Sequence, residues 1–468
     1  MHRLNIAKNT AADAVARPDI PGPVLEDWGQ VISFQPQFLV RPRSIDELEA
    51  VLERIHSGAL GGGRVRVPGS LHSCSQIVVS DALLDTSSLP KAIDFDPDGS
   101  AVTATANVTL HEFLAELSRR GKSVTATGGT DHQTLAGLIS TATAPASSRH
   151  ALYDLLEWVE LVTVDPGTGR AVRRRIARGD ADFPAVVCSL GVLGVLTHVR
   201  FRLVDERYFR VVQKVIHLDD VLADLDATSA TYDFWRVNWM PKSDKALLWA
   251  ATAVPREAAK PNGDYPTDVA EHVLDAVFAV ADRLTDTGPL LTGVLDVVYN
   301  LLAFAYRDSY ATGPMRNMLP VDRRAPLHVA MAEWSFRPQD VHRVIAHCRS
   351  YFDHYGWPNI PTEIELTRTD GNLMSPWNWE GLAYIVKFNF MYLTEVCRQP
   401  GEKAAISTHL RGLWDQLQAA DIPFKAHWGK INFIDPEFVR TNHHLDAFRP
   451  LISPMFVNDY LAQRLGPV

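Results

Sequence analysis

The 468-residue sequence predicts an α+β protein of two domains. A chain of this length is too long for a single compact core. Before residue 205, short β-branched segments alternate with amphipathic segments and glycine-containing turns, whereas beyond it tryptophans are frequent and longer helical segments alternate with strands. The change near residue 205 therefore marks the boundary between a first α+β domain and a second α+β domain with an aromatic-rich face.

The first domain is expected over residues 25–205, after a loose tail at 1–24. Ser44 followed by Glu47 predicts a capping box at the start of an amphipathic helix. Glycine turns and alternating β-branched residues place the other elements of this domain. These are strands at 64–67, 101–106 and 123–126, a helix at 110–120, a hairpin of 159–164 with 171–177, and a strand after the glycines at 191 and 194.

The second domain is expected over residues 206–422. Its apolar segment 289–306 reaches membrane length, but Asp296 and Asn300 would be costly in hydrocarbon, so a buried or interfacial helix is expected there. The other predicted elements of this domain are strands near 232–238, 327–336 and 384–390 and helices at 269–284 and 341–355.

Composition limits the class of function. A formal net charge of −9 argues against nucleic acid as the main partner, and the basic run 170–178 follows a turn and is expected as a solvated hairpin arm. The four cysteines include no C-x-x-C pair, which disfavours a disulfide framework and any zinc site. The N-terminus lacks the apolar core of a signal peptide. This feature and the unpaired cysteines predict a location in the reducing cytoplasm.

Three glycine- and hydroxyl-rich turns, at 69–73, 128–141 and 191–197, carry the chemistry of the first domain. The sequence has no G-x-G-x-x-G after a strand and no phosphate-binding loop of the G-x-x-x-x-G-K-[ST] type. The backbone N–H groups of glycine-rich turns can surround a phosphate, so the three turns together suit one long phosphate-bearing ligand such as FAD. Taken alone, the 69–73 turn also fits an ordinary surface turn with a solvated His72.

Several of these segments resemble a known flavoprotein family. Arg66 to Ser73, Gly129 to Thr141 and Leu190 to Thr197 resemble the FAD-binding domain of the vanillyl-alcohol-oxidase-type (PCMH-type) flavoproteins. Near the C-terminus, the segments Glu363 to Arg368 and His427-Trp428-Gly429-Lys430 resemble the sugar-1,4-lactone oxidase and alditol oxidase branch. The resemblance covers residues 25 to 450, roughly the whole chain.

The resemblance implies a two-part FAD-binding domain that is completed by a C-terminal return, residues 423–468, with a cap domain over the flavin. In many members, the histidine at the position of His72 bonds covalently to the flavin 8α carbon. A single tether is expected because 125–131 contains no cysteine, and Cys74 is expected as a small buried filler. The residues that the resemblance assigns to FAD binding are Pro68, Gly69, Ser70, Leu71, His72, Ser73, Gly129, Thr130, Thr134, Gly137, Thr141, Ala142, Gly194 and Val195.

The implied reaction is oxidation of a CH–OH group, with hydride transfer to flavin N5 and O2 as the acceptor, giving H2O2. Lys430 suits stabilisation of negative charge, and Glu363 suits anchoring or deprotonation of a hydroxyl, although a surface ion pair is the alternative for each. Glu365, Asn389 and His427 complete the expected substrate-binding residues. The alternative functions are a dehydrogenase of the same fold that uses a quinone, a cytochrome or a protein as acceptor, and a catalytically silent FAD-domain scaffold.

Two departures from the family pattern change the substrate that the sequence predicts. Relatives usually carry Thr-Gly-Thr-His-Gly where this chain has Thr141-Ala142-Thr143-Ala144-Pro145, and often Glu-x-Arg where it has Glu363-Ile364-Glu365. Glu363 and Glu365 share one face of a strand, whereas Arg368 points to the other face. Two carboxylates with one lysine give a net negative site, so an uncharged polyol, lactone or sugar-like natural product is expected.

Overall fold

The computed structural model describes residues 22–60, 63–239, 242–261, 263, 310–319, 328–394, 397 and 400–467. Most of the predicted N-terminal tail, the predicted helix 269–284 and the apolar segment 289–306 lie outside the described residues. Within them, no helix combines the length and the apolar character that crossing a membrane requires.

The N-terminal part is built on a five-stranded antiparallel sheet in the order β5-β6-β10-β8-β9. Its strands are β5 (Ile93–Phe95), β6 (Ala101–Thr105), β8 (Leu156–Val164), β9 (Ala171–Ala177) and β10 (Val195–Arg202). Helices α1 (Ile45–His56), α2 (Leu110–Arg119) and α3 (Leu135–Ser140) accompany it. Short pairs complete this part: β1 (Leu25–Glu26) with β2 (Ser33–Phe34), β3 (Phe38–Val40) with β4 (Ala82–Leu84), and β7 (Lys122–Ser123) with β11 (Val204–Asp205).

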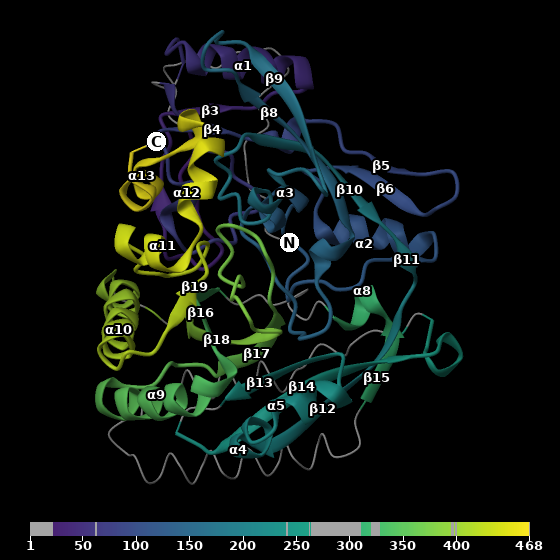
Figure 1. Ribbon diagram of the computed structural model, residues 1–468, viewed down its shortest axis with the longest axis vertical. Coiled ribbons are helices and arrows are strands. Elements are labelled where there is room, and N and C mark those ends of the chain that lie inside the picture. The colour runs from purple at the N-terminus through teal and green to yellow at the C-terminus, as the bar shows by residue number, and fades with distance from the viewer. Residues whose placement is uncertain are drawn as a thin grey trace.

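The second part is an eight-stranded antiparallel sheet in the order β15-β12-β14-β13-β17-β18-β16-β19, with the N-terminal part above it in Figure 1. Its strands are β12 (Tyr208–His217), β13 (Phe234–Trp239), β14 (Lys245–Val254), β15 (Tyr310–Pro314), β16 (Val329–Phe336), β17 (Thr362–Arg368), β18 (Tyr384–Leu393) and β19 (Phe424–Ala426). Its described helices are α4 (Leu218–Leu222), α5 (Leu225–Thr231), α8 (Met315–Met318), α9 (Val341–Tyr355) and α10 (Pro400–Ala419).

The two faces of the larger sheet differ in character. Aromatic rings of one face pack against α9 and α10: Trp334 lies 5.4 Å from Trp414, and Phe390 lies 6.0 Å from Phe352, between ring centroids. This face accounts for many of the tryptophans in the sequence, as an aromatic core does. Because side chains alternate along a strand, the polar residues between these rings point to the opposite face, toward the N-terminal part.

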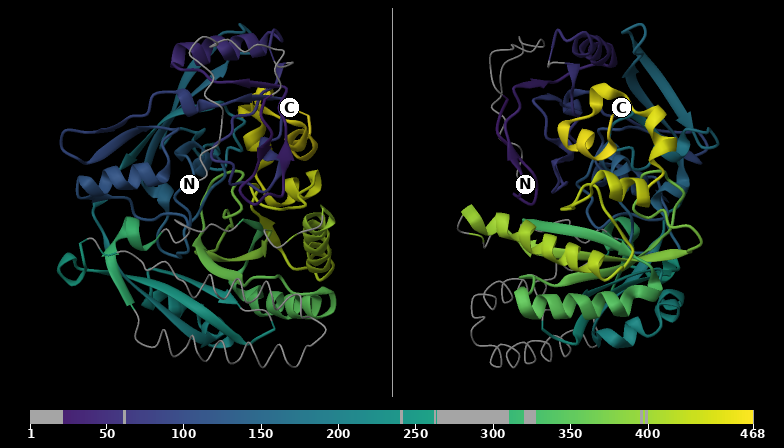
Figure 2. Two further views of the ribbon diagram at one scale, coloured as in Figure 1. Left: turned by 180° about the vertical axis from the view of Figure 1, so that it is seen from behind. Right: turned by 60° about the vertical axis from the view of Figure 1, so that its left-hand side comes forward.

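The C-terminal helices α11 (Pro436–Asn442), α12 (Leu445–Phe448) and α13 (Asp459–Leu465) pack beside the N-terminal part (Figure 2). The Val65 backbone N–H donates to the Met455 carbonyl at 2.8 Å, and Asn458 Nδ2 donates to the Val79 carbonyl at 2.8 Å. The last segment of the chain and the first strands thus form one body.

Most predicted elements are present, including the 341–355 helix, the hairpin and the three strands of the second part. At α1, Ser44 Oγ accepts from the Glu47 N–H, but the Glu47 carboxylate accepts from the N–H of Arg43 rather than Ser44, so half of the predicted capping box forms. The basic run lies on β9, where Arg173 pairs with Glu49.

Two predicted strands are wrong in extent. At 64–67 there is only a bridge between Arg66 and Leu83, because the N–H groups of Val65 and Arg66 donate to two different segments, at Met455 and Ala82. The predicted strand 123–126 is reduced to β7, since the Leu203 N–H beyond its partner β11 donates to the Ser100 carbonyl instead of extending the ladder.

Candidate active site

A groove in the N-terminal part brings the predicted turns together. It is bounded by residues 66–73, by α3 and by the 190–196 turn. Among the predicted FAD-binding residues, those that line it are Pro68, Gly69, Ser70, Leu71, His72, Ser73, Thr134, Gly137, Thr141, Gly194 and Val195. Gly129, Thr130 and Ala142 are not among its lining residues: Gly129 is exposed and Ala142 is fully buried.

The glycines of the groove are required where the backbone comes close to its neighbours. A Cβ on Gly69 would lie 2.9 Å from Thr134 Oγ1. Gly194 has φ +147°, and a Cβ there would lie 2.7 Å from the Val162 carbonyl oxygen. A side chain at either position would therefore disturb the wall of the groove.

Arg66 gives the groove an uncompensated positive charge. Among the described residues that line the groove, it is the one Lys or Arg, and none is an Asp or a Glu. Its guanidinium donates to the carbonyls of Ile77 at 2.8 Å, Leu190 at 2.6 Å and Phe456 at 2.5 Å, and burial lowers its pKa to about 10. A buried cation without a carboxylate favours an anionic ligand, so the groove fits the diphosphate of FAD.

His72 lines the groove and lies between two other rings. Its centroid is 5.5 Å from Trp28 and 6.2 Å from His132, with the two imidazoles nearly parallel. Burial, assisted by the charges of Lys430 and His132, lowers the pKa of His72 to about 3. His72 is therefore a neutral imidazole at neutral pH. Cys74 is buried, as predicted for a filler.

On the sheet face that points toward the N-terminal part, charged side chains form a cross-strand cluster. Glu365 of β17 is directly opposite Lys387 of β18, and Asn389 of β18 is directly opposite both Glu363 of β17 and Glu333 of β16. Directly opposite residues of neighbouring strands point to the same face. Glu363 and Glu365 therefore share a face, as predicted.

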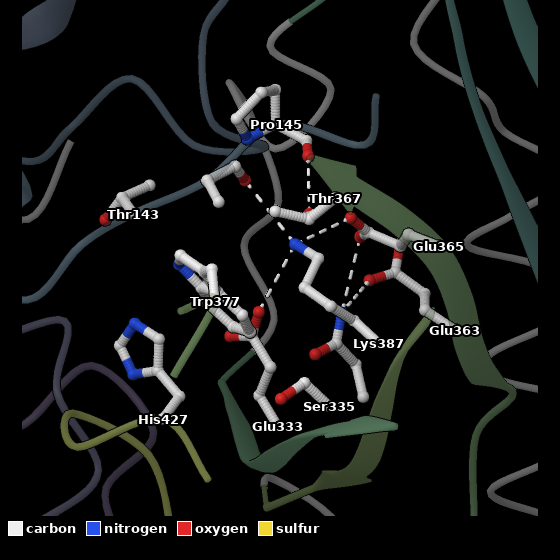
Figure 3. Close-up of polar contacts among 12 residues, drawn as sticks. Thr143, Pro145, Glu333, Ser335, Glu363, Glu365, Thr367, Trp377, Lys387 and His427 are labelled. Carbon is white, nitrogen blue, oxygen red and sulfur yellow. Dashed lines mark hydrogen bonds and ion pairs between the residues drawn. The ribbon is translucent and has the colours of Figure 1, made fainter. Parts of the chain in front are cut away.

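Each carboxylate of the cluster has a cationic partner, and Figure 3 shows the contacts of Lys387 with Glu365 and Glu333. Lys387 Nζ lies 3.0 Å from Glu365 and 3.3 Å from Glu333. On the neighbouring strand β13, Arg236 lies 2.8 Å from Glu363. The expectation of a net negative site with one lysine is wrong, because Lys387 and Arg236 balance charges that were counted as unpaired.

Burial and charge act against each other on these groups. Burial lowers the pKa of Lys387, but the charges of Glu365 and Glu333 outweigh it and the net shift is upward. Burial raises the pKa of Glu333, but the charges of Lys387, His427 and Lys430 outweigh it and the net shift is downward. Both residues are therefore ionised at neutral pH.

Arg368 lies apart from the cluster, as its odd spacing from Glu363 predicts. Its guanidinium pairs with Asp154 of the N-terminal part. It therefore supplies no positive charge beside Glu365.

The His-Trp-Gly-Lys segment joins the groove to the cluster. His427 Nδ1 accepts from the Gly429 N–H at 3.0 Å, its backbone N–H donates to the Glu333 carbonyl at 2.9 Å, and burial lowers its pKa to about 4. A Cβ on Gly429 would lie 2.8 Å from Ser73 Oγ. The Cys74 N–H donates to the Gly429 carbonyl at 2.8 Å, so the segment lies against the chain just beyond the groove residue Ser73, and the charge of Lys430 lowers the pKa of both His72 and Glu333.

The segment 141–145, which departs from the family pattern, contacts β17 and the turn that follows it through its carbonyls. The Ala142 carbonyl accepts from Trp377 Nε1 at 2.7 Å, and the Pro145 carbonyl accepts from Thr367 Oγ1 at 2.9 Å. Figure 3 shows Pro145 above Thr367, with Trp377 beside Lys387. Lys387 Nζ also donates to the Ala144 carbonyl at 3.5 Å, so this segment lies against the cluster.

Comparisons with known proteins agree with this arrangement. Residues 36–173 match the family model of an FAD binding domain, and residues 199–461 match that of D-arabinono-1,4-lactone oxidase. The chain belongs to the D-arabinono-1,4-lactone oxidase family. It is 28% identical to D-arabinono-1,4-lactone oxidase of Yarrowia lipolytica over 50% of this chain and 45% of that protein, and 26% identical to L-gulonolactone oxidase of Scyliorhinus torazame over 93% and 97%. The chain spans about half the length of the D-arabinono-1,4-lactone oxidases it matches.

Solved structures of cholesterol oxidases share the fold. The enzyme from Brevibacterium sterolicum has a TM-score of 0.76 at 14% identity, covering 99% of this chain and all of that one. A solvent-stable cholesterol oxidase has a TM-score of 0.68 at 18% identity, covering 88% and 87%. At these identities the likeness concerns the fold alone.

The sequence analysis missed three charged residues of this member of the D-arabinono-1,4-lactone oxidase family: Glu333, Lys387 and Arg236. Each lies on a predicted strand next to a large apolar residue: Glu333, for example, comes directly before Trp334, and Lys387 directly before Phe388. A charged residue within an otherwise buried strand is the signal that could have identified them.

Proposed function

We propose that this protein is an FAD-dependent oxidase that oxidises a CH–OH group of a neutral sugar lactone, polyol or sugar-like natural product. One observation carries the proposal: the segment 427–430 is bonded to both sites, because the Cys74 N–H, just beyond the groove residue Ser73, donates to the Gly429 carbonyl at 2.8 Å and the His427 N–H donates to the Glu333 carbonyl at 2.9 Å. The proposed positions of cofactor and substrate thus meet at the segment that carries Lys430.

The residues that line the groove would hold FAD, which would supply the hydride acceptor for the carbinol carbon; the hydride and the proton lost by the hydroxyl together account for the reduction of O2 to H2O2. Lys430 would stabilise the negative charge that develops as the substrate hydroxyl loses its proton. Glu363, whose charge is already balanced by Arg236, would anchor a substrate hydroxyl. Glu365 and Asn389 would extend this anchoring surface, and His427, with Nδ1 already bonded, would position Lys430 rather than contact the substrate.

Covalent attachment and location are further parts of the proposal. A neutral imidazole can form a bond to carbon through its free nitrogen lone pair, which supports a single tether at His72. All four cysteines are free, which supports a reduced compartment such as the cytoplasm.

Anaerobic mixing with substrates tests the proposed reaction. D-arabinono-1,4-lactone, L-gulono-1,4-lactone and the corresponding alditols should bleach the flavin absorbance, and turnover in air should release one H2O2 for each substrate oxidised. Bleaching without H2O2 formation would favour the dehydrogenase alternative. A bound flavin that no lactone, alditol or other alcohol can bleach would favour the silent scaffold.

A further inference from the structure

We infer that Asn432 is a positioning residue for Lys430, because its side-chain amide closes the turn that carries this lysine. The inference rests on the proposed function, in which the Lys430 ammonium stabilises developing negative charge. It adds a residue that acts through Lys430 and not through contact with the substrate.

The amide nitrogen of Asn432 bridges two carbonyls of the turn. Its Nδ2 donates to the Lys430 carbonyl at 2.8 Å and to the Trp428 carbonyl at 3.2 Å. An amide NH2 has two hydrogens, so each carbonyl receives one of them. The bridge therefore fixes the separation between the two ends of the segment 428–430.

The amide oxygen of Asn432 is fixed as well. It accepts from the Ile434 N–H at 3.3 Å and from the hydroxyl of Tyr460, on α13, at 3.1 Å. Carbonyls only accept and the Ile434 N–H only donates, so the nitrogen and the oxygen of the amide cannot exchange places. The amide thus connects the turn to the C-terminal helix α13.

Other contacts hold the first part of the same turn. Ser75 Oγ donates to the Trp428 carbonyl at 2.6 Å, and the Cys74 N–H donates to the Gly429 carbonyl at 2.8 Å. These bonds remain when the Asn432 amide is removed, whereas the bond to the Lys430 carbonyl is lost. Loss of the amide therefore loosens the turn at its lysine end first.

The position of the turn matters because a lysine acts through a flexible stem. Its ammonium is a point charge at the end of a four-carbon chain, so the backbone decides which positions the charge can occupy. A displacement of about 1 Å in a catalytic site can cost about 100-fold in rate. A looser turn should therefore slow flavin reduction while leaving the anchoring of substrate hydroxyls unchanged.

Stopped-flow measurements of anaerobic flavin reduction, with the best lactone or alditol substrate, provide the test. Asn432→Leu and Asn432→Ala should each lower the limiting rate constant at least tenfold and change the substrate dissociation constant less than threefold. In a Lys430→Ala background, the same substitutions should lower the rate constant by less than a further twofold, because residues that act as a unit are not additive.

Hydrogen exchange followed by mass spectrometry gives a readout that does not depend on turnover. The backbone N–H groups of 427–431 should exchange at least tenfold faster in the Asn432 variants. Asn442→Leu and Asn442→Ala are the matched controls, because Asn442 Nδ2 also donates to a backbone carbonyl, that of Phe438 at 3.0 Å, but within α11. Both controls should keep the wild-type rate constant and the wild-type exchange of 427–431.

The inference is overturned if the Asn432 variants reduce flavin at the wild-type rate, if their losses add in full to that of Lys430→Ala, or if exchange of 427–431 is unchanged. It is also overturned if both Asn432 variants fail to fold while both Asn442 variants fold, because Asn432 would then be structural. If no lactone or alditol reduces the flavin of the wild-type protein, the proposed function itself fails.

Discussion

Lys387 on β18 and Glu365 on β17 are directly opposite each other on neighbouring strands, with Nζ 3.0 Å from a carboxylate oxygen. Glu365 is an acid at the position where the resemblance to the family's Glu-x-Arg pattern would place an arginine. Positive charge is nevertheless present in the cluster. Lys387 supplies it from the adjacent strand β18, and Arg236 supplies it from the strand on the other side, β13. An acid at position 365 is therefore compatible with a charge-balanced cluster.

Lys387→Met should destabilise the protein by about 3 kcal/mol or more, because it leaves Glu365 and Glu333 buried without their cation. Adding Glu365→Gln to it should recover part of this loss, giving a coupling energy of about 1 kcal/mol or more in a double-mutant cycle. Chemical denaturation monitored by tryptophan fluorescence measures the free energy of unfolding of each variant, from which the loss of stability and the coupling energy follow. Arg173→Met, which breaks an exposed ion pair with Glu49, is the control and should have little effect. Additive single effects would show that the two charges are not coupled.

The sequence was sufficient to predict the groove but not the cluster. Glycine turns such as the one at Gly69 have local causes, and the residues around them line the groove as expected. The partners of Glu363 and Glu365 come from β13 and β18, and their contacts depend on strand order and register. No local pattern fixes the order of eight antiparallel strands, so the charge balance of the site could not be derived from the Glu-x-Glu motif alone.

Lys430→Ala and Glu363→Gln should each lower the second-order rate constant of anaerobic flavin reduction, the limiting rate constant divided by the substrate dissociation constant, by more than tenfold with the best substrate, a loss of more than about 1.4 kcal/mol of transition-state stabilisation. Lys430 is expected to act mainly on the limiting rate constant, because it stabilises developing negative charge. Glu363 is expected to act mainly on substrate affinity, because it anchors a substrate hydroxyl. Stopped-flow absorbance separates the two quantities. Wild-type reduction rates in both variants, with full flavin content, would make these residues structural.

His72→Ala should convert a tethered flavin into an extractable one. After denaturation in acid or detergent, the wild-type flavin should stay with the polypeptide, and the variant flavin should appear in the supernatant. In-gel flavin fluorescence measures the flavin that stays with the polypeptide, and absorbance of the extract measures the flavin that is released. His132→Ala, which removes the stacked neighbour but leaves His72 in place, is the control and should keep the tether. Complete release from the wild-type protein would exclude covalent attachment while leaving FAD binding intact.

Arg66→Gln, made in the His72→Ala background so that the flavin can exchange, should weaken FAD binding at least tenfold. Binding of riboflavin should weaken much less, since riboflavin lacks the diphosphate that the Arg66 charge is expected to attract. Titration of the apoprotein with each ligand gives the two dissociation constants. An equal loss for both ligands would mean that Arg66 serves only to hold the carbonyls of Ile77, Leu190 and Phe456.

His443 should make the protein less stable in acid. Its ring is buried beside Trp428, neither ring nitrogen has a hydrogen-bond partner in the described part of the chain, and burial lowers its pKa from 6.5 to about 3. Between these two values the unfolded chain binds a proton that the folded chain does not, so stability falls as the pH decreases from about 6.5 toward 3. At pH 5 this difference amounts to about 2 kcal/mol.

His443→Phe removes the titrating group while keeping a ring against Trp428. The difference in unfolding free energy between pH 7.5 and pH 5 should therefore shrink by about 2 kcal/mol relative to the wild type. Denaturation curves at the two pH values measure it, with His56→Phe, at an exposed position near the end of α1, as the control. Because the folded state excludes the proton, the variant should gain its advantage only on the acid side. An equal change at both pH values would mean that packing, not protonation, distinguishes the two proteins.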